Sequence, residues 1–189
     1  MNKEIYTLFE KSGAILSGHF VLASGKHSNL YLQSARLLQD PRRARHAGAE
    51  LKTLCSGLSV DVVISPALGG MIIGYELARQ MQKEFIFTER KEGTMQLRRM
   101  FEIIPRARYL IVEDVITTGE STLEVDRIVR DGGGKVSGFA SLVDRSGGNH
   151  CLPMDPYSLL KVQAELFTPE SCPMCRQNKP ITKPGSKQI

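Results

Sequence analysis

The chain has 189 residues, of which 41% are hydrophobic and 24% charged, and its formal net charge is +5 at pH 7. These values are ordinary for a globular protein with one sizeable core, and a modest positive charge suits anionic small molecules as well as nucleic acid. No apolar run approaches the length of a membrane span, and Glu4 and Glu10 interrupt the apolar segment that a signal peptide needs, so we expect a cytoplasmic protein.

The spacing of apolar residues and the positions of Gly and Pro predict strands that alternate with helices. Such alternation is typical of an α/β fold with a mostly parallel central sheet flanked by helices. The expected elements, in chain order, are a helix near 3–11, two extended segments around a turn within 19–33, a helix at 41–54, a strand at 60–66, a helix at 68–82, strands at 84–89 and 109–114, a helix at 121–134 and a strand at 135–144.

The segment YLIVEDVITTGEST, residues 109–122, carries the clearest chemistry in the chain. An apolar strand ends on Glu113 and Asp114, at the edge where parallel sheets bind ligands. The small and hydroxyl residues at 117–121 then lead into a helix, where backbone N–H groups and the helix dipole favour a phosphate. Acids beside such a loop suit sugar hydroxyls or a phosphate-associated Mg²⁺, so the pattern predicts a sugar-phosphate site. A purely structural strand end is the alternative.

This segment resembles the phosphoribosyl pyrophosphate (PRPP) signature of the type I phosphoribosyltransferases. In that family two acids contact the ribose hydroxyls, and the loop after them holds the 5′-phosphate. The segment SPALGGMIIGYELA, residues 65–78, resembles the family's pyrophosphate loop. Glu120 is a departure, because a small residue is usual at its position. The resemblance implies that the PRPP-binding residues are Ala67, Leu68, Gly69, Glu113, Asp114, Val115, Ile116, Thr117, Thr118, Gly119, Glu120 and Ser121.

The resemblance also implies the architecture of that family. A central, mostly parallel sheet flanked by helices would carry a small hood from the N-terminal segment, about 1–35, to which the C-terminal tail could contribute. The phosphoribosyltransferase domain would cover 1–168 as a single unit. A Cys-rich, Pro-rich and basic tail would follow at 169–189.

Two further stretches, GHFVLASGKHSNLYLQS at 18–34 and LVDR at 142–145, are similar to the orotate phosphoribosyltransferase family. With the PRPP and pyrophosphate segments, the resemblance spans roughly 14–147. Ala23 stands where many members have a lysine. Taken alone, Arg145 could be a surface arginine and Tyr31 a core residue. The orotate-binding residues that the resemblance implies are Lys26, Tyr31, Leu32, Thr117 and Arg145.

The segment FTERKEGTMQLRRMFEI, residues 87–103, is basic and lies between two predicted strands. A basic loop that closes over pyrophosphate would stabilise the charge on the leaving group and exclude water. In the resembling family this is the catalytic loop, which serves the neighbouring subunit. The implied catalytic residues are Arg90 and Lys91, together with Asp114. The family's Lys-x-His is missing, Arg98 and Arg99 are its candidate replacements, and a solvated charged hairpin is the alternative.

The function that the resemblance implies is Mg²⁺-dependent transfer of ribose 5-phosphate from PRPP to orotate, giving orotidine 5′-monophosphate and pyrophosphate in pyrimidine biosynthesis. The implied partners are PRPP, orotate and a second copy of the chain, with no nucleic acid and no membrane. PRPP and water would hold the Mg²⁺, since the protein offers no evident metal cage. A phosphoribosyltransferase for another base and a PRPP-sensing regulator remain as alternatives, although a regulator is expected to add a DNA-binding module or a broad basic face.

The four cysteines are more typical of thiols or metal ligands than of a disulfide framework. Cys172 and Cys175 form a C-x₂-C pair in the tail, and His150 and Cys151 precede it along the chain. These four residues could form a tetrahedral structural zinc site, with ordinary thiols or a disulfide as alternatives. Cys55 is expected in the core. His27 is expected to be a polar turn residue.

Overall fold

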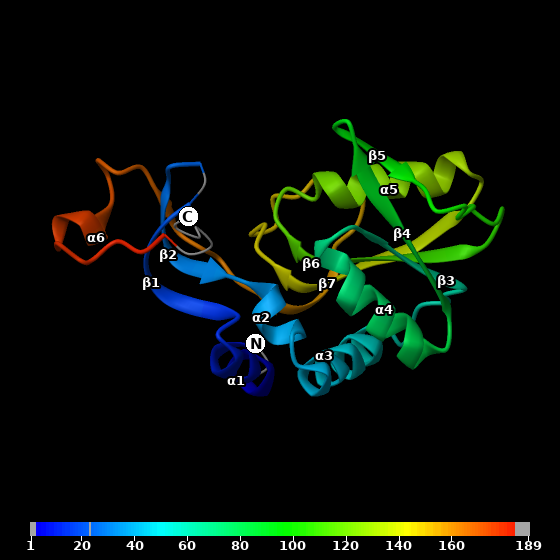
Figure 1. The fold of residues 1–189 in the computed structure, drawn as a ribbon, viewed down its shortest axis with the longest axis horizontal. Coiled ribbons are helices and arrows are strands. Elements are labelled where there is room, and N and C mark those ends of the chain that lie inside the picture. Colours follow the sequence, from blue (N-terminus) through cyan, green and yellow to red (C-terminus); the bar gives the residue numbers. More distant parts are fainter. Residues whose placement is uncertain (1–2, 23, 184–189) are drawn as a thin grey trace.

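The computed structural model describes residues 3–22 and 24–183. Figure 1 shows a large α/β body with a smaller lobe beside it. The elements are α1 (Lys3–Ser12), β1 (Ile15–Val21), β2 (His27–Leu32), α2 (Ser34–Leu38), α3 (Pro41–Leu54), β3 (Val62–Pro66), α4 (Gly69–Met81), β4 (Glu84–Lys91), β5 (Thr94–Leu97), β6 (Arg108–Ile116), α5 (Glu120–Asp131), β7 (Lys135–Asp144), β8 (Tyr157–Lys161), β9 (Leu166–Phe167) and α6 (Pro173–Arg176).

The body is built on a six-stranded sheet with the strand order β5-β4-β3-β6-β7-β8. Every neighbouring pair is parallel except β4 and β5, which are antiparallel. The predicted α/β class and the mostly parallel sheet are therefore confirmed. Because β3, β6 and β7 run in the same direction, their carboxyl ends lie along one edge of the sheet, and the loops that follow them gather there.

Helices cover both faces of this sheet, so two apolar cores form. Successive residues of β6 point to opposite faces, as the pleat of a strand requires. Leu110 and Val112 pack in the core under α3 and α4. Tyr109 and Ile111 pack in the core under α5. Burial on both faces explains why the central strands read as continuous apolar runs in the sequence.

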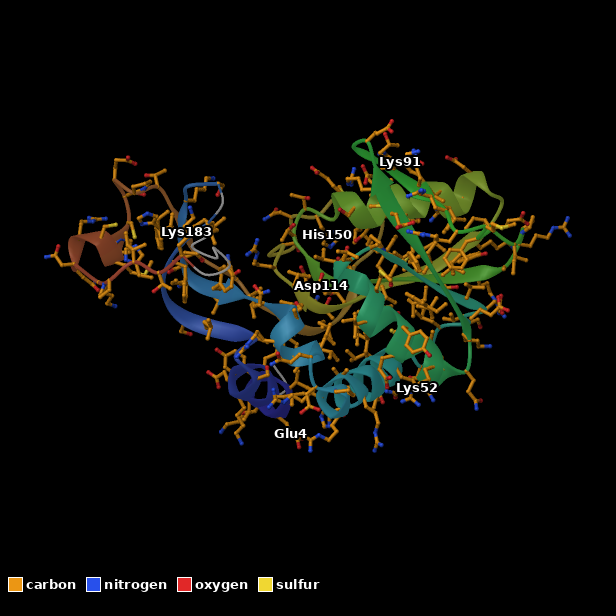
Figure 2. All side chains as sticks on the ribbon, in the orientation of Figure 1. Glu4, Lys52, Lys91, Asp114, His150 and Lys183 are labelled. Carbon is orange, nitrogen blue, oxygen red and sulfur yellow. The ribbon has the colours of Figure 1, made fainter. Side chains whose placement is uncertain are left out.

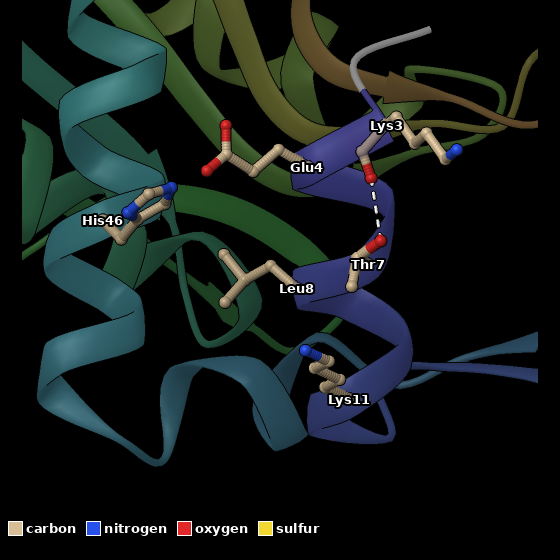
Figure 3. A pocket seen from close by; sticks show the side chains of 6 residues that line it. All are labelled: Lys3, Glu4, Thr7, Leu8, Lys11 and His46. Carbon is tan, nitrogen blue, oxygen red and sulfur yellow. Dashed lines mark hydrogen bonds between the residues drawn. The ribbon is translucent and has the colours of Figure 1, made fainter.

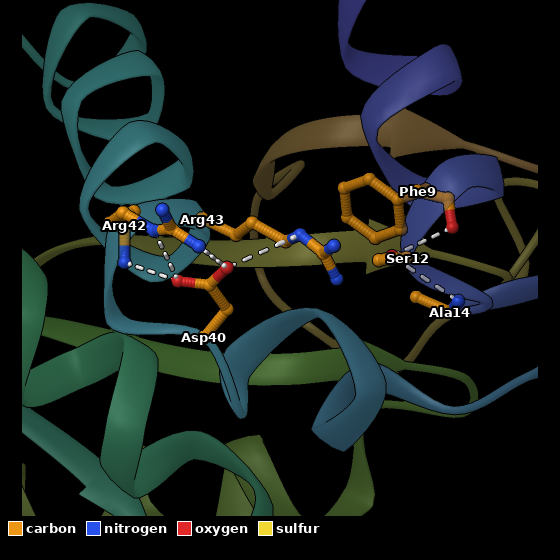
Figure 4. A network of polar contacts seen from close by, with 6 residues as sticks. All are labelled: Phe9, Ser12, Ala14, Asp40, Arg42 and Arg43. Carbon is orange, nitrogen blue, oxygen red and sulfur yellow. Dashed lines mark hydrogen bonds and ion pairs between the residues drawn. The ribbon is translucent and has the colours of Figure 1, made fainter.

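The start of α3 illustrates how local sequence sets a helix boundary (Figure 4). Pro41 occupies the first turn, where its missing N–H costs nothing. Asp40 caps the helix, because its Oδ1 accepts a hydrogen bond from the backbone N–H of Arg42 at 2.9 Å. The guanidinium groups of Arg42 and Arg43 also approach Asp40 Oδ2, at 3.1 and 3.7 Å.

The smaller lobe, called the hood from here on, consists of the antiparallel sheet β1-β2-β9 together with α6. It joins the first part of the chain to the last, since His27 pairs with Phe167 and Phe20 forms an isolated bridge with Thr182. The predicted turn around Ser24-Gly25 connects β1 to β2. The hood therefore combines β1 and β2 of the N-terminal segment with the tail as far as residue 183, as the fold expectation allowed.

The basic segment after β4 is a hairpin. β4 continues to Lys91, turns through Glu92 and Gly93, and pairs with β5. Both turn residues have positive φ, which matches the twist of a tight two-residue hairpin. The segment that the resemblance predicts as the catalytic loop is therefore folded as a charged hairpin in this structure. Across residues 3–22 and 24–183, no helix has the length and apolar character that crossing a bilayer requires.

Candidate active site

The loop between β6 and α5 lies at the carboxyl edge of the sheet. The chain leaves β6 at Ile116, and α5 begins at Glu120, so three residues make the turn. Gly119 caps α5 with φ of +82°, a conformation that favours glycine. A hollow of about 250 Å³ opens at this loop and is lined by Glu113, Val115, Ile116, Thr117, Thr118, Gly119, Glu120, Ser121 and Thr122.

The side chains around this hollow differ in what they can offer a ligand. Thr117, Thr118 and Glu120 are exposed. Ile116 is only 1% exposed because its side chain packs in the core, so it can present only its backbone. With a hydroxyl on each threonine and the N–H groups of the first turn of α5, of which that of Glu120 makes a long 3.4 Å contact with Thr118 Oγ1, the loop has the donors that bind a phosphate.

Glu113 and Asp114 are adjacent acids in different environments. Glu113 is 9% exposed, and its burial, reinforced by the neighbouring charge of Asp114, raises its pKa to about 9. It therefore keeps its proton at neutral pH. Asp114 is half-buried, and its Oδ1 accepts the N–H of Val115 at 2.9 Å. The pair thus offers one protonated carboxyl and one accessible carboxylate, which suits the hydroxyls of a sugar.

The turn between β3 and α4 packs directly against these acids. A Cβ added at Gly69 would lie 2.5 Å from Asp114 Oδ1, and one at Gly70 would lie 2.5 Å from the carbonyl oxygen of Val112. The peptide bond between Ala67 and Leu68 is cis, and the side chain of Leu68 is 83% exposed. The structure therefore brings the predicted pyrophosphate loop and the predicted ribose acids together.

Arg145 follows β7 at the same edge. Its backbone N–H donates to the carbonyl oxygen of Ile116 at 2.8 Å, and the N–H of Ser146 donates to Asp144 Oδ1 at 2.8 Å. A further hydrogen bond joins the segment after β7 to the loop between β6 and α5, because the N–H of Cys151 donates to the carbonyl oxygen of Thr118 at 2.9 Å. These bonds fix the segment after β7 beside the loop at 117–121, where Arg145 was expected.

The predicted base-reading residues lie on β2 or at its start, in the hood. Lys26 is exposed, and Tyr31 and Leu32 are half-buried. Tyr31 Oη donates to Gln33 Oε1 at 2.8 Å, and Leu32 packs against the core that also receives Val115. The predicted departure at Ala23 lies outside the described residues.

The basic residues of the β4–β5 hairpin contact acids of the same chain. The Arg90 guanidinium pairs with Glu124 on α5 and donates to the carbonyl oxygen of Gly93. Arg99 makes two hydrogen bonds of 2.9 Å to Glu89. Lys91 is exposed near the tip of the hairpin (Figure 2).

The predicted ligand set for zinc needs correction. His150 Nε2 lies 3.3 Å from Asp155 Oδ1. The backbone N–H of Cys151 donates to Thr118, beside the candidate active site. The side chains that gather around Cys172 and Cys175 are instead His19 and His27, and these four residues are called the His/Cys cluster from here on. Figure 2 shows His150 in the body, away from the hood.

The sequence predictions for His27 and Cys55 have different outcomes. His27 is buried within β2, so its assignment as a polar turn residue was wrong. Cys55 is 1% exposed in the core, as expected, and burial raises the pKa of its thiol to about 12.

A larger hollow lies elsewhere, between α1 and α3. Its volume is about 530 Å³, and Figure 3 shows the residues that line it. They are Lys3, Glu4, Thr7, Leu8, Lys11 and His46. This hollow combines neither paired acids nor a glycine turn at a strand end, so the carboxyl edge of the sheet remains the candidate active site.

Comparison with known proteins agrees with this geometry. The family model described as "Phosphoribosyl transferase domain" matches residues 34–171. A protein of Desulforamulus reducens named orotate phosphoribosyltransferase is 47% identical over 190 residues, which cover 100% of both chains. One of the same name from Pelotomaculum thermopropionicum is 48% identical over 98% of both chains. The crystal structure of orotate phosphoribosyltransferase from Aeropyrum pernix superposes with a TM-score of 0.68 at 28% identity, covering 84% of this chain and 93% of that one.

The fold and the site thus define a phosphoribosyltransferase. Within that class, the full-length similarity shows that the chain belongs to the orotate phosphoribosyltransferase family.

Proposed function

We propose that this chain catalyses transfer of the 5-phosphoribosyl group from PRPP to orotate, giving orotidine 5′-monophosphate and pyrophosphate for pyrimidine nucleotide biosynthesis. The observation that carries the proposal is the segment 113–121, in which Glu113 and the first turn of α5 line one hollow beside Asp114. The choice of base is supported by the names of relatives that are nearly half identical over their whole length.

In this proposal the loop holds PRPP by its phosphate and its ribose. Thr117, Thr118 and the backbone N–H groups at the start of α5 bind the 5′-phosphate. Asp114 accepts hydrogen bonds from the ribose hydroxyls. Glu113, which keeps its proton in the free protein, adds a donor to the same sugar. In the complex the exposed side chain of Glu120 would turn to solvent, so that only its N–H takes part.

Orotate binds on the hood side of the ribose. Arg145 is the cation that faces its carboxylate, because the guanidinium group is suited to paired hydrogen bonds with a carboxylate. Lys26, together with the backbone at Tyr31 and Leu32, recognises the edge of the pyrimidine. Thr117 lies between the two substrates and contacts both.

The residues of the site suit a Mg²⁺ ion that is bound mainly by PRPP and water. Mg²⁺ keeps several waters and usually binds through one or two carboxylates together with phosphate oxygens. Asp114 offers an accessible carboxylate, and within residues 3–22 and 24–183 the only group of three or more metal-binding side chains is the His/Cys cluster. When bound, Mg²⁺ supplies positive charge to the pyrophosphate. No dedicated carboxylate cage is required.

The chemistry is a displacement at C1′ of the ribose. The bond from C1′ to the pyrophosphate oxygen breaks and the pyrophosphate leaves with the electron pair. A ring nitrogen of orotate forms the new bond with inversion, and its N–H proton passes to solvent. The protein contributes position and charge. Backbone groups of Ala67, Leu68 and Gly69 hold the pyrophosphate, while Arg90 and Lys91 neutralise the charge that develops on it.

We further propose a homodimer in which the basic hairpin completes the neighbouring site. The α4 surface next to the candidate pyrophosphate loop exposes Leu68, Ile72 and Tyr75 by 83, 52 and 60%. These residues are spaced so that they share one helix face. An apolar face of this kind suits a second copy of the chain. Size-exclusion chromatography with light scattering should give a molar mass of twice that of the chain. The Ile72→Glu variant should give the mass of a single chain.

The central test is a spectrophotometric assay with PRPP and Mg²⁺ that follows loss of orotate absorbance, with uracil and hypoxanthine as competing bases. We expect turnover of orotate alone. Arg145→Ala should lower kcat/KM for orotate by about 100-fold, because a carboxylate loses its charged partner. The matched control is Arg127→Ala, which removes an exposed arginine of α5 and should leave the rate unchanged.

Two outcomes of this assay would redirect the proposal. Turnover of uracil or hypoxanthine in place of orotate would assign another base. PRPP binding with no turnover of any base would favour a PRPP-sensing regulator, which a salt-dependent interaction with nucleic acid would then support. We propose the cytoplasm as the compartment, because PRPP and orotate are metabolites of the cell interior.

A further inference from the structure

The His/Cys cluster joins the two ends of the chain inside the hood. His19 lies on β1 and His27 begins β2, whereas Cys172 precedes α6 and Cys175 lies within it. His19 Nε2 is 3.5 Å from Cys172 Sγ and 3.7 Å from Cys175 Sγ. His27 Nδ1 is 3.3 Å from Cys175 Sγ and 2.9 Å from His19 Nε2. All four donor atoms lie within 4.8 Å of one another.

We propose that these four side chains form a structural zinc site of the Cys₂His₂ type. Zn²⁺ binds nitrogen at about 2.0–2.1 Å and sulfur at about 2.3 Å in a tetrahedron, which places neighbouring N and S atoms roughly 3.6 Å apart. The observed N···S distances run from 3.3 to 3.7 Å. The N···S spacing therefore already suits one ion, and the two histidine nitrogens, 2.9 Å apart, would separate to roughly 3.3 Å on binding.

Burial also favours a closed structural site. Cys172 is fully buried, and His19 and His27 are only 4 and 5% exposed. Among charged side chains, Glu170 interacts electrostatically with both His27 and Cys175. Mixed nitrogen and sulfur ligands in a tetrahedral arrangement select zinc over the oxygen-seeking ions Mg²⁺ and Ca²⁺. A closed set of four protein ligands leaves no open position for catalysis.

The outer contacts orient the ligands. His19 Nδ1 lies 2.9 Å from the carbonyl oxygen of Lys179, to which it can only donate. The proton on Nδ1 leaves Nε2 as the unprotonated atom, and Nε2 is the one that faces the two sulfurs. Such a hydrogen bond from a histidine ligand to a carbonyl group is the usual support around a metal.

The fold explains why the ion would be needed here. Cys172 and Cys175 are separated from His19 by 153 and 156 residues along the chain. Otherwise the tail is held to the hood by the two-residue strand β9 and by a few backbone bonds, such as Thr182 N–H to the carbonyl oxygen of His19 at 2.8 Å. An ion bound to both ends of the chain would fix the tail on β1 and β2.

The test is metal analysis of the full-length protein purified without chelator. We expect about one zinc per chain, and close to none in His19→Asn or Cys175→Ser. The matched controls are His150→Asn and Cys151→Ser, which remove the other histidine and cysteine pair and should keep the zinc. Replacement of zinc by Co²⁺ should give the visible bands of a tetrahedral ion and the near-ultraviolet charge-transfer band of cobalt thiolate.

Three results would overturn the proposal. The first is a metal-free protein that takes up neither Zn²⁺ nor Co²⁺ after thiol reduction. The second is a thiol titration that finds Cys172 and Cys175 joined as a disulfide in the purified protein. The third is equal zinc content in all four variants. If His19→Asn or Cys175→Ser does not fold, the thiols of the wild-type protein are modified chemically instead. We then expect one zinc to be released per chain as Cys172 and Cys175 react.

Discussion

The body and the hood are both built around a β-sheet, but different interactions hold them together. In the body, β3 is buried along its whole length, and helices cover both faces of the sheet. In the hood, three consecutive residues of β1 are exposed, β2 is half-buried over most of its length, and β9 contributes two residues. Apolar burial can stabilise the body, whereas the hood depends on polar contacts and the His/Cys cluster.

This difference has a functional consequence. The candidate PRPP loop is anchored to the rigid body, with its acids at the end of a buried strand. Of the residues expected to bind orotate, Lys26, Tyr31 and Leu32 lie on the less buried hood, whereas Thr117 and Arg145 belong to the body. In a site divided in this way, the body fixes the phosphate-binding residues. The positions of the hood residues that recognise the base depend on the contacts that stabilise the hood.

The largest effect is expected from Gly69→Ala, which tests whether the body positions the acids. The added Cβ would lie 2.5 Å from Asp114 Oδ1, so the carboxylate must move. Displacement of a positioned group by about 1 Å can cost on the order of 100-fold in rate. Steady-state kinetics should show a fall of about that size. Gly57→Ala, where the Cβ meets open space, is the control, and full activity in Gly69→Ala would contradict the assigned site.

Glu113→Gln should change how the stability of the body depends on pH. The folded protein holds the Glu113 proton up to a pKa of about 9, whereas the unfolded chain releases it near the usual value of 4.5. The carboxyl therefore destabilises the fold increasingly as the pH rises through that window. Near pH 8 the ligand-free variant should be more stable by on the order of a few kcal/mol.

Denaturant unfolding of both proteins between pH 5 and pH 9 measures this effect. The stability of the parent should fall with pH more steeply than that of the variant. Parallel pH profiles would show that Glu113 is ionised in the folded protein.

Glycine substitutions compare the packing of the two regions directly. A Cβ at Gly74 on α4 would lie 2.1 Å from Ser65 Oγ and 2.7 Å from the Phe85 ring. Gly74→Ala should therefore destabilise the body by about 2 kcal/mol. In the hood, a Cβ at Gly18 meets only the Phe20 ring at 3.1 Å, so Gly18→Ala should cost less. Thermal unfolding measures both losses of stability. If Gly74→Ala and Gly18→Ala lose the same stability, the proposed difference in packing between body and hood is contradicted.

The smallest effect is expected at the start of α3. Asp40→Ala removes the cap on the N–H of Arg42 and should lower the free energy of unfolding by about 1 kcal/mol. Arg42→Ala leaves the cap in place and removes only an exposed ion pair, so its cost should be near zero. If the two variants lose the same stability in urea unfolding, the ion pair and not the cap is the main interaction.

The sequence predicts the body well because the relevant information is local. The acid pair and the hydroxyl loop occupy consecutive positions, and apolar spacing identified α3 as 41–54, the range that the structure shows. Arg145 was placed correctly beside the loop because parallel strands end at one edge. The β4–β5 hairpin was less certain, since a short polar turn with Gly93 is compatible with a mobile loop as well.

The hood was harder to predict because its contacts join distant parts of the chain. The sequence prediction paired Cys172 and Cys175 with His150 and Cys151, which precede them along the chain. A stronger signal was available in the predicted turn around Ser24-Gly25, which places His19 and His27 on adjacent strands of one hairpin. Only the tail's return to that hairpin, which no local pattern encodes, completes the His/Cys cluster.

The most direct test of the difference between body and hood is hydrogen exchange measured with and without a strong zinc chelator. We predict faster exchange in β1, β2 and the segment 166–183 after chelation, with the amides of β6 and β7 unchanged. Unchanged exchange in the hood, or equal acceleration in both regions, would contradict the claim that the hood is held by the His/Cys cluster while the body is held by its own core.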